Sequence, residues 1–245
     1  MTRIPLFPPL LKGLATGPAD PFRVACGQAE RGVDSGLLTW SIADGRLRAA
    51  LVLAPEVALE PAMAAFCACA VGAQNALGAL APPELAVHLD WTGGLRLNGG
   101  HCGGLRVAAA HDPDATRDPA AVPDWLVVGL DLTLGLPDDL EPGQTPDWTA
   151  LDQEGGADID PITLLEAWAR HSLVWINDLD DPSGRASLFR EWESLAWNLG
   201  QTISLPLEGT RLVGTFLGLD ENFGMVLKTG AATRLIPLST LIEKV

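Results

Sequence analysis

Three glycine pairs, a histidine and a cysteine are concentrated in the stretch Asp90–Ala109. Backbone amides of glycine-rich segments can bind phosphate, and a histidine near a cysteine can activate the thiol as an acyl acceptor. A simpler interpretation holds for Gly93–Gly94 and Gly99–Gly100, which follow a threonine and an asparagine: they supply positive φ to two tight turns. The pair Gly103–Gly104 lies within an expected strand, where missing side chains let a ligand or another backbone approach closely.

His101 and Cys102 are consecutive residues of this expected strand. Consecutive strand residues point to opposite faces, which disfavours direct pairing of the imidazole and the thiol. We therefore predict a packed, unreactive Cys102, and a cysteine-dependent acyltransferase is kept as a third functional hypothesis. Cys67 and Cys69 lie two apart on an expected helix, on different faces, and do not bind a metal ion together. No histidines or cysteines have zinc-ligand spacing, so no metal site is predicted.

The charge and cysteine content exclude several classes of protein. The chain has 245 residues, 16 Lys plus Arg, 31 Asp plus Glu, and a net charge of −15. This charge repels a phosphate backbone, so nucleic-acid binding is not expected. Four cysteines are too few for a disulfide scaffold in a chain of this length. The first residues also lack the apolar segment of a signal peptide. We expect a cytoplasmic monomer or homodimer.

Short strands and one helix are expected in the first half of the chain. Leu37–Ile42 and Leu47–Pro55 flank an Asp-Gly pair, which is typical of a hairpin. The uncharged, alanine-rich stretch Pro61–Pro83 predicts a helix packed on a sheet rather than a membrane span, because alanine contributes little to membrane transfer. An antiparallel meander is expected after it, followed by another buried strand over Trp125–Gly135.

The second half begins with two amphipathic helices. Asp160 is the expected N-cap of the first, with proline at its first position, and Gly200 is the expected C-cap of the second. Short strand-like segments separated by turns follow, which indicates a small β-barrel. The predicted fold is α+β, with a mixed, largely antiparallel sheet and helices on one face over residues 1–200. The small barrel is expected over residues 201–245.

Several strings, in this order, resemble the biotin/lipoate A/B protein ligase family, in particular the catalytic core of biotin protein ligases. QAERG (Gln28–Gly32) resembles the family's adenylate loop. DWTGGLRLNGGHCGGLRVA resembles the strand pair that carries a Lys-Trp-Pro-Asn-Asp motif and then a lysine. VVGLDLTLG resembles the family's Gly-Ile-Asn strand, and GTFLGLDENFGMVL its SH3-like C-terminal domain. The resemblance covers nearly the whole chain.

Members of this family use ATP and magnesium to activate the carboxylate of biotin or lipoate as an acyl-adenylate, which then acylates a lysine of a carrier-protein domain. The resemblance implies that Asp90 and His101, the candidate catalytic residues, occupy two lysine positions of the reaction centre, and that Asp131 occupies an asparagine position. The other implied ligand-binding residues are Gln28, Arg31, Gly32, Trp91, Gly103 and Gly104. No DNA-binding module is expected.

The departures from the family pattern remove positive charge where negative charge develops during the reaction. Losing one such donor costs about 2.7 to 4 kcal/mol, or roughly 10²- to 10³-fold in rate. Histidine, with an ordinary pKa of about 6.5, is mostly neutral at cytoplasmic pH. We therefore expect slow ATP-dependent ligation, and we expect lysine at both Asp90 and His101 to raise its rate. The alternative is a non-catalytic protein that binds a small acid or nucleotide.

Overall fold

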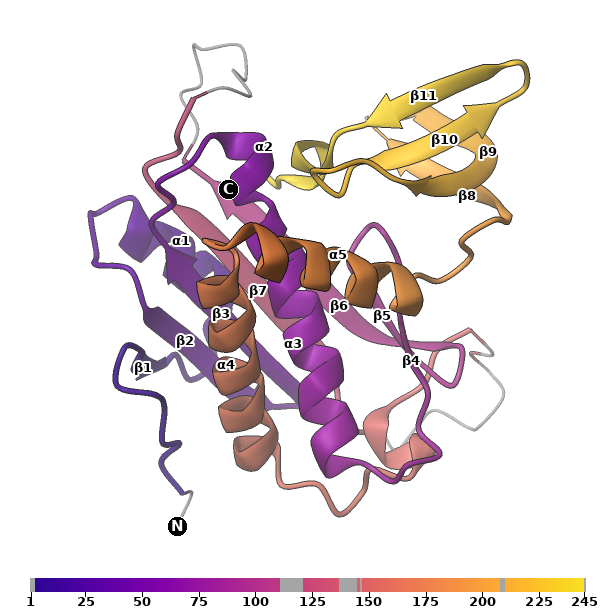
Figure 1. Ribbon diagram of the computed structural model, residues 1–245. Coiled ribbons are helices and arrows are strands. Elements are labelled where there is room, and N and C mark those ends of the chain that lie inside the picture. Colours follow the sequence, from indigo (N-terminus) through magenta and orange to yellow (C-terminus); the bar gives the residue numbers. More distant parts are fainter. Residues whose placement is uncertain (1–2, 111–120, 137–144, 146, 208–209, 245) are drawn as a thin grey trace.

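A seven-stranded mixed sheet forms the centre of the molecule (Figure 1). The structure is a computed structural model that describes residues 3–110, 121–136, 145, 147–207 and 210–244. The strand order is β1-β2-β3-β7-β6-β5-β4, with β1 parallel to β2 and every other neighbouring pair antiparallel. The bounds are β1 Lys12–Ala15, β2 Leu37–Ala43, β3 Arg46–Leu53, β4 Val87–Leu89, β5 Gly94–Leu97, β6 Gly100–Ala109 and β7 Leu126–Thr133. The predicted mixed, largely antiparallel sheet is confirmed.

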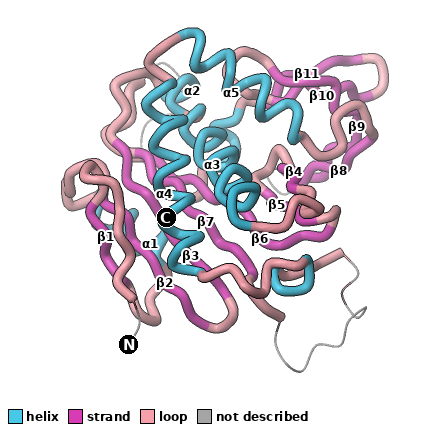
Figure 2. Tube along the Cα trace, turned by 60° about the horizontal axis from the view of Figure 1, so that its bottom comes forward, coloured by secondary structure: helices cyan, strands magenta, loops and turns pink. Residues whose placement is uncertain are grey.

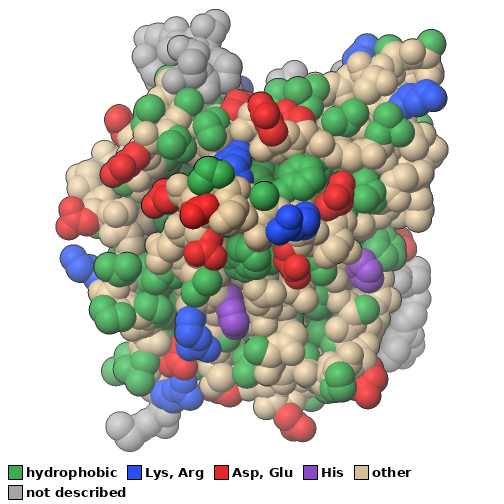
Figure 3. All heavy atoms as spheres, viewed as in Figure 1, with side chains coloured by type: hydrophobic (Ala, Val, Ile, Leu, Met, Phe, Trp, Pro, Cys, Tyr) green, Lys and Arg blue, Asp and Glu red, His purple; other side chains and the backbone are tan. Residues whose placement is uncertain are grey.

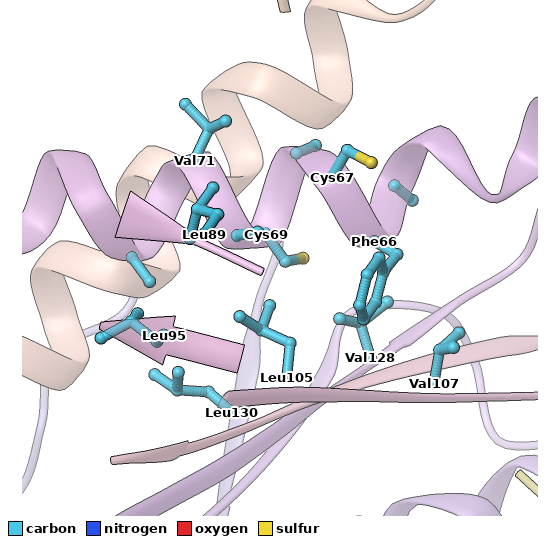
Figure 4. Close-up of a cluster of buried hydrophobic side chains, with 14 of the residues drawn as sticks. Phe66, Cys67, Cys69, Val71, Leu89, Leu95, Leu105, Val107, Val128 and Leu130 are labelled. Carbon is cyan, nitrogen blue, oxygen red and sulfur yellow. The ribbon is translucent and has the colours of Figure 1, made fainter. Parts of the chain in front are cut away.

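Three long helices cover one face of this sheet (Figures 1 and 2). They are α3 Ala64–Leu80, α4 Pro161–Asp178 and α5 Pro182–Leu195, and the short α2 Leu59–Ala62 precedes α3. Asp160 caps α4 as predicted, because its side chain accepts a hydrogen bond from the Thr163 amide. Side chains of α3 such as Phe66 pack toward Leu105, Val128 and Leu130 of the sheet (Figure 4). This contact forms the main hydrophobic core.

Helix α3 is the predicted alanine-rich helix. The stretch Leu59–Leu80 is long and apolar enough to cross a membrane, but 72% of its most apolar window is buried inside the protein. Cys67 and Cys69 are both buried, as predicted. An apolar helix that contacts the sheet and two other helices needs no lipid to cover it, so the structure supports the core interpretation.

A further helix, α1 Pro21–Ala29, packs against the opposite face of the sheet. Asp20 caps it by accepting a hydrogen bond from the Phe22 amide, and Phe22 and Ala25 pack on Ala50 and on other sheet residues that face away from the main core. The sequence analysis expected one helix in this half of the chain and missed α1. Its nine residues, PFRVACGQA, include a glycine and are too few to show a clear helical period.

The C-terminal strands form a separate four-stranded antiparallel sheet, in the order β11-β10-β9-β8. Its strands are β8 Thr202–Leu207, β9 Thr210–Leu219, β10 Met225–Thr229 and β11 Ala232–Ile236. The predicted short strands after Gly200 are confirmed. The prediction of Gly200 as the C-cap of the second helix is wrong: α5 ends at Leu195 with Ala196 as its C-cap, because Ala196 forms a β-bridge with Leu89. Closure of these strands into an SH3-like barrel, and the division into domains of residues 1–200 and 201–245, stay predictions.

Candidate functional site

The side of the sheet that carries α1 is only partly covered by that helix. Strand alternation places Ala49 and Leu51 of β3 in the main core, and Ala50 against α1. Arg46 and Arg48 share the orientation of Ala50 but lie beyond the helix and remain about one-third exposed. We call the uncovered area the open face. The other face, seen in Figure 3, carries Lys and Arg side chains scattered among carboxylates over the helices.

A β-bulge places His101 on the open face. The register between β5 and β6 shifts, so that Leu95 pairs with Gly103 and Arg96 pairs with His101, which leaves Cys102 as the extra residue. The imidazole therefore shares the open face with Gly104 and Arg106, although His101 and Gly104 are an odd number of positions apart along the strand. Bulges commonly redirect side chains in this way. As predicted, His101 and Cys102 point to opposite faces.

Asp90, Arg96 and His101 form a compact charged cluster on the open face. Arg96 Nε donates to both Asp90 carboxylate oxygens, at 3.0 and 3.1 Å, and Arg96 Nη1 donates to the Gly99 carbonyl at 2.8 Å. Arg96 Nη2 lies 2.7 Å from His101 Nε2, which is 3.3 Å from Asp90 Oδ2. The sequence analysis missed Arg96. Its alternation with Leu95 and Leu97 was the available signal, because it places Arg96 on the polar face of the strand.

The environment of His101 favours its neutral form. Burial lowers the pKa of its imidazole below 6.5; Asp90 acts to raise that pKa and Arg96 to lower it further. His101 therefore does not replace the positive charge of a lysine at neutral pH. The fixed positive charge at this place belongs to Arg96.

Asp131 is held by two arginines. Arg46 Nε donates to its Oδ1 at 2.8 Å, and Arg48 Nε lies 3.6 Å from its Oδ2. Asp131 adds a negative charge at the position where the family has asparagine, but the three side chains together carry a net positive charge. Gly104 is the cross-strand neighbour of Asp131 and of Gly94, so the glycines separate this group from the Asp90 cluster.

The glycines between these groups have structural reasons of their own. Gly93 and Gly99 have φ values of 97° and 93°, as predicted for turns, whereas Gly94 and Gly100 begin strands. A Cβ on Gly104 would lie 2.7 Å from the Gly93 carbonyl oxygen, and one on Gly103 would overlap the Asp131 carbonyl. The close approach at Gly103 and Gly104 is therefore made by backbone, and ligand contact at these residues stays a prediction.

Trp91 and Cys102 are core residues. Trp91 is 3% exposed, and its Nε1 donates to the Phe223 carbonyl of the C-terminal segment at 2.9 Å. Cys102 is fully buried, and its Sγ donates to the Thr133 carbonyl at 3.2 Å. Burial raises the pKa of the Cys102 thiol to about 12. The prediction that Cys102 is packed is therefore confirmed. The neighbouring groups that lower the pKa of its thiol, the Thr133 carbonyl contact and Arg46, do not offset the effect of burial.

Gln28, Arg31 and Gly32 lie at the end of α1. The Val33 amide donates to the Gln28 carbonyl at 3.1 Å, and Gly32 has a φ of 78°, which closes the helix with a left-handed residue. Arg31 is exposed. Within the described residues, no hydrogen bond or ion pair joins Arg31 to Asp90, His101 or Asp131, so the role of this loop in binding stays a prediction.

The open face has groups for an anion and none arranged for a metal. Four arginines lie on it or at its edge: Arg46, Arg48, Arg96 and Arg106. Guanidinium groups suit carboxylates and phosphates. In the described part of the chain, no three His, Cys, Asp or Glu side chains form a metal-binding group. Magnesium that accompanies a nucleotide is usually held by phosphates and one or two carboxylates. The open face therefore fits a magnesium ion that arrives with a nucleotide, and not one held by the protein alone.

The sheet with its three-helix cover and polar open face defines a protein of the biotin protein ligase fold. Over 93% of this chain and 95% of the other, it superimposes with a TM-score of 0.67 and 18% identity on the biotin protein ligase of Aquifex aeolicus in complex with biotin and ATP. It superimposes with a TM-score of 0.88 and 52% identity on a biotin protein ligase-like protein of unknown function from Silicibacter, over 98% of this chain and all of the other.

Sequence comparison assigns the family. The model of the biotin/lipoate A/B protein ligase family matches residues 7–194, and the model of a domain of unknown function, DUF4444, matches residues 209–244. A biotin–[acetyl-CoA-carboxylase] ligase of Paracoccus denitrificans is 29% identical over 202 residues, which are 81% of this chain and 80% of that protein. The chain belongs to the biotin/lipoate A/B protein ligase family.

Proposed function

We propose that this protein binds a small carboxylic acid of the biotin or lipoate type on the open face of its sheet. With ATP, it converts the acid slowly to an acyl-adenylate for transfer to a lysine of a carrier-protein domain. The observation that carries the proposal is the grouping of Arg46, Arg48 and Arg96 on one face of the sheet, in a chain of net charge −15. Family membership supports the class of reaction. We place this activity in the cytoplasm.

Each side chain has a distinct part in this proposal. The two positive charges of Arg46 and Arg48 exceed the single negative charge of Asp131, so this group can attract an anion. Gly94, without a side chain, leaves room for the Asp90 carboxylate and the His101 ring beside β5, and Gly104 leaves room for the Gly93 carbonyl. ATP supplies the adenylyl group: the carboxylate of the acid attacks the α-phosphate, and pyrophosphate leaves. The protein's own contribution is to orient the acid and to stabilise negative charge with arginines instead of the family's lysines.

A second candidate is a protein that binds the acid or a nucleotide without reacting it. The observation in its favour is that every one of the four arginines already contacts a carboxylate: Asp131, Asp90, Asp20 or Glu243. A cation that is already paired stabilises a developing charge less than a free one. The two candidates share the binding site and differ only in turnover.

Ligand titration and pyrophosphate release test both steps. We expect calorimetry to detect binding of at least one of biotin, lipoate or octanoate, and Arg48→Met to weaken it. The matched control is Arg190→Met, on the outer side of α5. With ATP, magnesium and that acid, we expect pyrophosphate release at least about a hundredfold slower than by a competent ligase, the loss for one missing donor. Binding without any release supports the second candidate, and binding of none of the acids refutes the proposal.

A further inference from the structure

Arg96 is held rigidly in the middle of the open-face cluster. Each of its three guanidinium nitrogens has a partner: Asp90 for Nε, the Gly99 carbonyl for Nη1 and His101 for Nη2. The guanidinium also lies 5.1 Å from the ring centre of Trp197, and the side chain is only 17% exposed. A planar donor fixed on four sides cannot turn away from the imidazole, so its contact with His101 is a constant feature of the site.

This contact dictates where His101 carries its proton. A guanidinium has only N–H donors and does not lose a proton in proteins. At 2.7 Å from Arg96 Nη2, the Nε2 atom of His101 must therefore accept, and its single proton must reside on Nδ1. A doubly protonated imidazole would direct one N–H at another across this distance, which is repulsive.

The charged groups around His101 have opposing effects. Asp90, in the turn between β4 and β5, and Asp147, before the segment that bridges to His101, both favour the imidazolium. Arg96 on β5 opposes them, as does partial burial. Without Arg96, Asp90 Oδ2 would be left 3.3 Å from Nε2 as an unopposed acceptor, and the proton would be drawn to that nitrogen.

We propose that Arg96 is a positioning residue of the acid-binding site: it holds His101 as the neutral Nδ1–H tautomer and supplies the fixed positive charge beside it. This inference rests on the proposed function. Within the described residues His101 Nδ1 makes no hydrogen bond, so its N–H is available to an oxygen of the bound acid. The site then presents a neutral N–H donor at His101, and the positively charged Arg96 lies directly opposite it on β5.

Nitrogen NMR of the ligand-free protein tests the tautomer directly. The chain has four histidines, so His101→Gln identifies the signals of His101. We expect the wild-type imidazole to stay neutral with its proton on Nδ1 from pH 6.5 to 8. In Arg96→Met, we expect the proton to move to Nε2 and the pKa of His101 to rise by about one pH unit or more, because Asp90 is then unopposed. Arg96→Lys keeps a positively charged N–H donor, so we expect His101 in this variant to be neutral with its proton on Nδ1, as in the wild type. The control Arg190→Met should leave the tautomer and the pKa of His101 unchanged.

A wild-type His101 that is protonated on Nε2 overturns the inference without any variant, so a variant that fails to fold leaves the test intact. An unchanged tautomer and pKa in folded Arg96→Met also overturn it. Calorimetry with biotin separates this result from the proposed function. We expect the wild-type affinity to vary less than about twofold between pH 6.5 and 8, and that of Arg96→Met to vary more. If the wild type binds none of biotin, lipoate and octanoate, the proposed function fails while the tautomer result stands.

Discussion

At the scale of single residues, the site has a positive charge, but Arg96 carries it instead of lysines at positions 90 and 101. Lysine is absent at positions 90 and 101, but Arg96 lies between these two residues and contacts both. The cost of this arrangement is that Arg96 is paired with Asp90 and therefore less available to a ligand. Restoring the family's lysines would thus not simply add charge to an empty place.

Because Arg96 contacts both Asp90 and His101, lysines at these two positions are expected to have a different effect from the one the sequence alone predicts. In Asp90→Lys/His101→Lys, two ammonium groups would surround the Arg96 guanidinium without a carboxylate, and we expect pyrophosphate release no faster than in the wild type. Adding Arg96→Leu removes the repulsion, and the triple variant should be faster than the double variant, by up to about a hundredfold for one regained donor. A double variant that exceeds the wild type, with no gain in the triple, would contradict the role given to Arg96.

Cysteine reactivity tests the acyltransferase hypothesis. All four cysteines are buried, and burial raises the pKa of Cys26, Cys69 and Cys102 to about 12. Because thiolates are the reactive form, the native protein should show no fast thiol with a disulfide reagent, and four after unfolding. A single fast thiol that disappears in Cys102→Ala would restore the hypothesis.

The family resemblance placed Asp90, His101 and Asp131 in one site, but the sequence did not reveal their partners. Partners across strands depend on register, and here a bulge at Cys102 changes the register in the middle of the site. Arg96 and the Arg46–Arg48 pair could be recognised only once the register was known. The same bulge explains the φ of 140° at Gly103.

At the scale of elements, two glycines of α3 have opposite surroundings. A Cβ on Gly72 would lie 2.5 Å from the Ser172 Oγ and 2.8 and 2.9 Å from the backbone N and Cα of Ser172 in α4. One on the exposed Gly78 would meet only the flexible Gln74 side chain, at 3.7 Å. Gly72 therefore sets the distance between α3 and α4. Gly78 contributes only the conformational freedom of glycine.

We expect Gly72→Ala to lower the free energy of unfolding by about 1 to 3 kcal/mol through overpacking. Gly78→Ala, the matched control in the same helix, should raise it by up to about 1 kcal/mol through helix propensity. Urea denaturation measures both. Because Ser172→Ala removes the contact with Oγ but leaves the two contacts with backbone atoms, it should rescue Gly72→Ala only in part. Equal stability of the two glycine variants would show that the helices adjust freely.

Sequence patterns predicted the long helices because each had a cap, a clear period or an uncharged run over many residues. The short helix α1 lacked those signals, and its formation depends on contact with the sheet. Phe22, for example, packs where Gly129 leaves space; a Cβ on that glycine would lie 2.6 Å from the Phe22 ring. Such tertiary support is invisible in the local sequence.

At the scale of the whole molecule, the histidines make stability depend on pH. Burial lowers the pKa of His101 and of His171 below 6.5, so the folded state binds protons less readily than the unfolded state. Their contribution to stability is therefore present above about pH 6.5 and is lost as pH falls through the lowered folded pKa values. Between pH 7.5 and 5.5, we expect the wild type to lose more free energy of unfolding than His101→Gln in urea titrations. Equal losses would contradict the lowered pKa of His101.

The C-terminal sheet is attached to the main sheet at both of its ends. At its start, the Trp197 amide donates to the Leu89 carbonyl at 2.8 Å. After its last strand, the Glu243 amide donates to the Val107 carbonyl at 2.8 Å, and the Glu243 carboxylate pairs with Arg106. A fusion partner or purification tag placed after the last residue therefore begins beside Arg106, at the edge of the open face. A tag placed before the first residue begins near Arg3, which pairs with Glu166 of α4 on the helical side, so protein made for ligand assays should carry its tag there.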